Sequence, residues 1–166
     1  MPPSIEEMAR ALNVDQRPPV LSLPGLPALN ACMGTLMDPA PPLEEAAALE
    51  LSQLLEPRGC KLLDNDGRER GIIVLDQRAA VMLGALLLGL PREDAERQIV
   101  QGQPSDDCLL ATSEICNNLT GPLNAVPGNE HVRSTALVEV NVGELPEVRH
   151  RLDLQVDGGR VILAMF

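Results

Sequence analysis

Hydrophobic and polar positions follow three different periods along this chain, and each period predicts a different kind of element. In residues 105–124 apolar side chains recur every three or four positions, which is the spacing of a helix with one buried stripe. Residues 77–90 are apolar on nearly every side and predict a fully buried helix. Residues 135–142 and 151–156 alternate between apolar and polar positions, as half-buried strands do. The chain therefore mixes helices and strands.

Further elements follow from caps, turns and shorter apolar runs. These are helices over residues 43–56 and 92–101 and strands over residues 60–63, 71–75 and 161–166. Prolines before residue 43, glutamates in the first turn and many Ala and Leu residues favour the first of these helices. An Asp-Gly pair between strands 60–63 and 71–75 predicts a hairpin, and the unbroken apolar run of residues 72–75 indicates cover on both faces. Asp76 is expected to cap helix 77–90, in which Gly84 and Gly89 allow close packing.

These elements predict an α+β fold, in which long helices pack on an antiparallel sheet. We expect one globular unit, with its main domain at residues 43–166 and a proline-rich arm at residues 1–42. The closely spaced prolines of the arm limit it to short pieces, here a strand at residues 20–23 and a helix at residues 28–37. One or two amphipathic turns are expected at residues 5–12. The arm either packs across the core or serves as a docking peptide or dimer arm, and its residues do not select between these roles.

Composition narrows the classes of partner. A formal net charge of −11 disfavours a nucleic-acid backbone as partner, because a phosphate-binding surface needs a basic patch. The single aromatic residue, Phe166, also argues against stacking on bases. We therefore expect no nucleic-acid partner.

The cysteines and histidines do not form a metal-binding pattern. No pair of the four cysteines has CxxC spacing, and the two histidines stand alone, so we expect no metal site. Cys108 and Cys116 fall on the buried stripe of helix 105–124, where they are expected to be small core residues. The N-terminus lacks the apolar region of a signal peptide, and the longest apolar run, residues 79–90, is too short to cross a bilayer. We expect a cytoplasmic protein with no membrane partner.

Helix 105–124 combines strong helix signals with chemically useful side chains. Ser105 is a good N-cap. At about 100° per residue, Glu114 and Asn117 share the face that points away from the buried stripe. A carboxylate and a carboxamide one turn apart can bind a partner and orient a water molecule together. Leu110 and Gly121 lie on the same face, and Asn118 is expected to be half shielded.

The pattern Glu114-Ile115-x-Asn117-x-x-x-Gly121-x-Leu123, at the end of a capped amphipathic helix, resembles the active helix of the CheC/CheX/FliY family of chemotaxis phosphatases. A strand and a buried helix ending in Leu-Gly-Leu-Pro precede it, as in that family. The resemblance is clearest over residues 70–123. It implies a CheX-like, single-motif enzyme that hydrolyses the aspartyl phosphate of a CheY-type receiver domain.

By this resemblance, Asn117 orients the attacking water and Glu114 grips a lysine of the receiver domain. Leu110, Asn118 and Gly121 are expected to contact the partner. Mg²⁺ would belong to the receiver domain, and no cofactor is expected on this chain. The alternative is a non-catalytic binding module that holds a receiver domain or a motility-complex partner with the same helix face.

Three further features bear on the resemblance. Pro122 follows Gly121 where the family helix continues, so the helix is expected to kink or stop there. The resemblance permits a homodimer through the last strands, since residues 161–166 would form an apolar edge that needs cover. Asn30, Gly34 and Leu36 repeat the spacing of Asn117, Gly121 and Leu123. CheC-type proteins carry two active helices related by such a repeat, but here Pro27 stands at the position that corresponds to Glu114. They are either a decayed repeat or a chance match.

Overall fold

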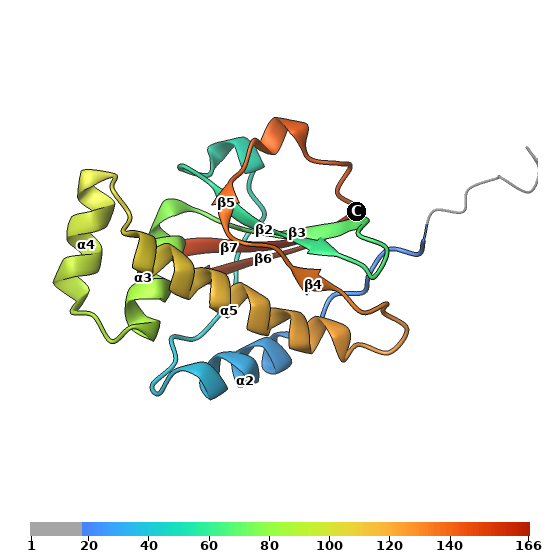
Figure 1. The fold of residues 1–166 in the computed structure, drawn as a ribbon, viewed down its shortest axis with the longest axis horizontal. Helices are drawn as coiled ribbons and strands as arrows, with labels where there is room; N and C mark the ends of the chain where they lie inside the picture. The colour runs from blue at the N-terminus through green and yellow to red at the C-terminus, as the bar shows by residue number, and fades with distance from the viewer. Residues whose placement is uncertain (1–17) are drawn as a thin grey trace, which may run out of the picture.

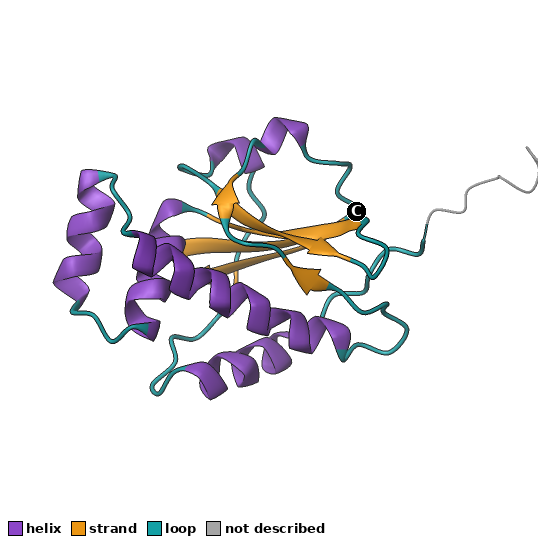
Figure 2. Cartoon of the chain, in the orientation of Figure 1, coloured by secondary structure: helices purple, strands orange, loops and turns teal. Residues whose placement is uncertain are grey.

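The protein is built on one antiparallel sheet, and the computed structural model describes residues 18–166 of it (Figures 1 and 2). The expected turns at residues 5–12 lie outside this range. Within it, the sheet has 7 strands in the order β1-β6-β7-β3-β2-β4, with β5 also paired to β2. The strands are β1 Glu44–Glu45, β2 Arg58–Leu63, β3 Glu69–Leu75, β4 Arg133–Ser134, β5 Val138–Glu139, β6 His150–Val156 and β7 Gly159–Met165. The predicted α+β class is confirmed.

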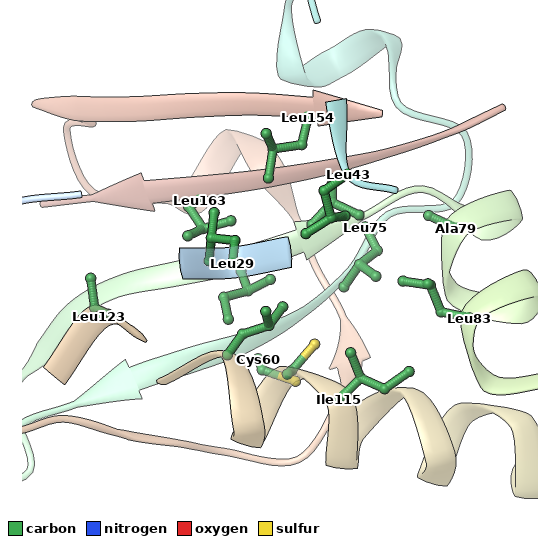
Figure 3. Packing of buried hydrophobic residues seen from close by; sticks show 14 of the residues in the cluster. Leu29, Leu43, Cys60, Leu75, Ala79, Leu83, Ile115, Leu123, Leu154 and Leu163 are labelled. Atoms are coloured by element: carbon green, nitrogen blue, oxygen red, sulfur yellow. The ribbon is translucent and has the colours of Figure 1, made fainter. Parts of the chain in front are cut away.

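Helices cover one face of this sheet. They are α2 Leu26–Leu36, α3 Gln77–Leu87, α4 Arg92–Gln101 and α5 Asp106–Asn124. Helix α5 crosses in front of the sheet between α3 and α2, while α4 packs at the outer end of α3 (Figure 1). The main core lies between this layer and the sheet, and Leu29, Ile115 and Leu163 belong to it with almost no exposed surface (Figure 3). No helix among residues 18–166 is long and apolar enough to span a membrane.

The opposite face of the sheet has a smaller apolar layer. The 3₁₀ turns η1 Leu51–Gln53 and η2 Val142–Glu144 lie over it, and Leu54 packs there on Ile72 and Ile162. Strands β3 and β7 are therefore buried on both sides. This confirms the interpretation of the apolar run at residues 72–75.

The contact between α3 and α5 depends on a missing side chain. A Cβ on Gly84 would lie 2.0 Å from the backbone oxygen of Cys108, so the predicted close packing at Gly84 is confirmed. Gly89 has a different role. It has open space around it and a φ of +67°, and it lies just beyond the end of α3, which stops at Leu87 and not at residue 90. The predicted cap is present, because the Asp76 carboxylate accepts a hydrogen bond from the Ala79 N–H at 2.8 Å.

The helix predicted at residues 43–56 is wrong. This segment forms strand β1, extended chain and the turn η1. Leu43 is buried in the core on the helical side of the sheet, whereas Leu54 is buried on the opposite side. The segment forms the outer edge of the sheet, where β1 pairs with β6, and from there it reaches both layers. A helix with a single apolar stripe cannot contribute to both.

The chain ends in an interior strand and not in an edge strand. Strand β7 pairs with β3 on one side and with β6 on the other. This corrects the expected apolar edge at residues 161–166, and it removes the basis given above for a homodimer interface. Residues 135–142 contribute only the short strand β5, and residues 20–23 form no strand.

Helix α5 continues through Pro122 to Asn124, so the expected stop there is wrong. Proline has no N–H, which leaves the carbonyl of Asn118, four residues earlier, without its helical donor. The Cys32 thiol of α2 donates to this carbonyl at 3.4 Å. Packing of α2 against α5 therefore supplies the hydrogen bond that the proline removes.

Candidate functional site

Helix α5 has one face in the core and one face open to solvent. The Ser105 hydroxyl caps it by accepting a hydrogen bond from the Cys108 N–H at 3.2 Å. Ile115 and Cys116 are fully buried beneath the helix, as predicted for Cys116. Side chains on the open face are exposed, and we call this surface the Glu114–Asn117 face: Leu110, Glu114, Asn117 and Gly121.

Glu114 is held by its neighbour on the next turn. The Asn118 amide nitrogen donates to the Glu114 carboxylate at 3.1 Å and to the Glu114 carbonyl at 2.9 Å. Asn118 is half-buried, as helix geometry predicted. Its amide therefore orients the carboxylate of Glu114 and is already engaged in doing so.

Asn117 is differently placed. Its Oδ1 accepts a hydrogen bond from the Ser134 hydroxyl at 3.4 Å, near the upper limit for such a bond. Among residues 18–166 its amide nitrogen has no hydrogen-bond partner. The amide nitrogen of Asn117 is therefore available to a water molecule or a partner.

The segment after α5 packs beside this face, a contact that was not predicted from the sequence. Ser134 lies on β4, and the Leu137 N–H donates to the Ser113 hydroxyl of α5 at 3.2 Å. No sequence signal links Ser134 to Asn117, because a loop and a change of direction separate them.

The Cys116 thiol, buried under the site, is a neutral group. A hydrogen bond with Cys60 of β2, together with burial, raises the pKa of the Cys116 thiol well above its ordinary value. This thiol stays protonated at neutral pH and behaves as a small core group. Between residues 18 and 166, no group of three or more His, Cys, Asp or Glu side chains is arranged to hold a metal ion.

The partial repeat in α2 does not form a second site of the same kind. Helix α2 lies alongside α5 (Figure 1). The Asn30 side chain donates to the carbonyl of Leu43 at 3.0 Å and accepts from the N–H of Leu43 at 2.8 Å. Both ends of this amide are used to fix the chain that follows α2.

Solved structures with the same fold come from chemotaxis proteins. One chain of the CheX–CheY–BeF3–Mg²⁺ complex from Borrelia burgdorferi aligns with a TM-score of 0.55 and 12% identity, over 84% of this chain and 94% of that one. CheX from Vibrio vulnificus aligns with a TM-score of 0.52 and 16% identity, over 84% and 91% of the two chains. FliY from Thermotoga maritima gives 0.52 and 13%, over 83% and 84%.

No protein-family model matches the sequence, and no curated protein matches it either. At identities this low, structural similarity establishes the fold alone. The likeness extends over most of each chain, and it agrees with the resemblance seen in α5. This chain therefore has the CheC/CheX/FliY-like fold.

Proposed function

We propose that this protein is a CheX-like phosphatase that hydrolyses the aspartyl phosphate of a CheY-type receiver domain. The observation that carries the proposal is the exposed pair of Glu114 and Asn117, one turn apart on a helix fixed by its buried side. The fold supports it, since a structural neighbour is a complex of CheX with CheY, BeF3 and Mg²⁺.

The phosphatase needs to supply few catalytic groups for this reaction. An aspartyl phosphate is a reactive acyl phosphate, and the Mg²⁺ of the receiver domain neutralises the charge that develops during transfer. What remains is to hold a water molecule in line with the phosphorus. The available amide of Asn117 performs this role, as a glutamine does in GTPases.

Glu114 provides recognition in this mechanism. Its carboxylate, oriented by Asn118, pairs with a lysine of the receiver domain and fixes the position of α5 over the phosphate. Gly121 adds no side chain and has open space around it, so the partner can approach the helix closely. Leu110 contributes apolar contact.

The test compares two neighbouring asparagines. Phosphate loss from candidate receiver domains of the same organism is followed with Mg²⁺ for wild type, Asn117→Ala and Asn118→Ala. We expect Asn117→Ala to lower kcat about 100-fold with binding retained, because a misplaced nucleophile costs about that factor. Asn118→Ala should keep kcat and raise KM a few-fold, since it only orients Glu114.

Two results contradict the catalytic role. Unchanged dephosphorylation by Asn117→Ala would refute the water-positioning role. No acceleration by wild type on any receiver domain, with a stable complex still formed, would identify a non-catalytic binding module. Glu114→Ala tests recognition separately, because it should weaken the complex, and an unchanged affinity would show that its assigned role is wrong.

A further inference from the structure

A second surface feature adjoins the Glu114–Asn117 face. A groove of about 650 Å³ runs between the end of α3 and the first turns of α5. Its apolar lining includes Leu88, Leu90 and Leu110, and its charged lining residues are Asp107 and Glu114. We call it the α3–α5 groove. Figure 1 shows the end of α3 lying beside the start of α5.

Three of the four leucines that line the groove are exposed to solvent. Leu88 is 46% exposed, Leu90 37% and Leu110 71%. Single exposed leucines are ordinary, but leucines that line one depression form a continuous apolar patch, and such patches mark interaction sites. The apolar part of this groove therefore needs an explanation that the fold does not supply.

The charged groups in the groove have one sign. Both of its charged lining residues, Asp107 and Glu114, are acidic, and none of its lining residues is basic. An occupant that complements this surface presents an apolar side chain next to lysine or arginine. A second copy of a chain with net charge −11 would instead bring more negative charge to it.

We propose that the α3–α5 groove docks an apolar side chain of the receiver domain that is flanked by a basic residue, and that it selects among receiver domains. This inference rests on the proposed function. Glu114 belongs both to the groove and to the Glu114–Asn117 face. A receiver that pairs with Glu114 therefore lies over the groove as well. Contact there fixes which receiver binds, while Asn117 sets the rate of hydrolysis.

The test removes apolar surface from the groove and leaves the catalytic face intact. The probes are the CheY-type receiver domains of the same organism, each held in its active form by beryllofluoride and Mg²⁺. We expect the double variant Leu88→Ser/Leu90→Ser to raise Kd and KM about tenfold with kcat unchanged. Leu88→Ser alone, at the more exposed of these two positions, should act in the same direction and serves if the double variant folds poorly.

Val100→Ser is the matched control. Val100 is 85% exposed on α4 and does not line the groove. The same kind of substitution there should leave Kd within twofold of wild type. Asp107→Asn tests the attraction between the acidic groove and a basic residue of the receiver domain. It should weaken binding at low salt more than at high salt.

The outcomes separate this inference from the proposed function. Unchanged Kd in the groove variants would overturn the docking role, while Asn117→Ala would still report on catalysis. No hydrolysis, with tenfold weaker binding of the groove variants, would refute the phosphatase and keep the docking surface. Self-association that is lost in Leu88→Ser/Leu90→Ser would show that a second copy occupies the groove and would overturn the proposal.

Discussion

The contact between α3 and α5 gives a sharp test of the packing that holds the candidate site in place. Replacing Gly84 with Ala would put a Cβ 2.0 Å from the Cys108 carbonyl oxygen and 2.7 Å from its carbon. Ordinary contact begins at 3.4 Å, so the new methyl group is about 1.4 Å too close. The obstacle is backbone of a neighbouring helix, which cannot rotate away as a side chain can. The two helices must therefore separate.

The size of the effect follows from two opposing terms. Overpacking a core costs about 1–3 kcal/mol, and a backbone obstacle places this case near about 3 kcal/mol. Alanine gains about 1 kcal/mol over glycine inside a helix. The expected net loss is about 2 kcal/mol in the free energy of unfolding. For a chain of this size that lowers Tm by about 6 °C.

Urea and thermal unfolding followed by circular dichroism measure this loss. Gly34→Ala is the control, because Gly34 lies inside α2 with nothing within 4 Å of its added Cβ. It should gain up to about 1 kcal/mol from helix propensity alone. A Gly84→Ala protein as stable as wild type would show that the close approach of α3 and α5 is not needed.

Two further predictions concern single contacts. Cys32→Ala should lower the free energy of unfolding by about 0.5–1 kcal/mol, because it removes the hydrogen bond to the Asn118 carbonyl. The loss should be smaller in a Pro122→Ala background, where the restored N–H can bond to that carbonyl. A double-mutant cycle of urea unfolding measures both losses, and equal losses in the two backgrounds would refute this account. Burial raises the pKa of the Asp64 carboxyl, but hydrogen bonds from Arg68 and from the Asp66 N–H outweigh it and hold the pKa below its ordinary value. The stability from this carboxylate is then fully present above about pH 4 and is lost as the pH falls through the lower pKa of the folded state. Unfolding midpoints of wild type should therefore drop more steeply below about pH 4 than those of Asp64→Asn, and parallel curves would contradict this assignment.

Elements whose signals are complete within a few turns were predictable from the sequence. The cap at Ser105 and the apolar stripe of α5 are local, and so are the Asp-Gly turn of the β2–β3 hairpin and the cap of α3. Helix arithmetic likewise predicted that Glu114 and Asn117 are exposed together. These features depend on period and propensity, which the residues carry wherever the chain lies.

Tertiary structure decided the rest. Residues 43–56 have the composition of a helix, yet they must supply Leu43 to one side of the sheet and Leu54 to the other, so they run extended around an edge. Pro122 stays within α5 because a thiol from α2 satisfies the carbonyl it leaves free. Ser134 and the groove leucines Leu88 and Leu90 reach the site only through the packing of other elements on α5. The sequence determined the helix that carries the candidate chemistry, and contacts between distant segments determined what surrounds it, because such contacts have no local period.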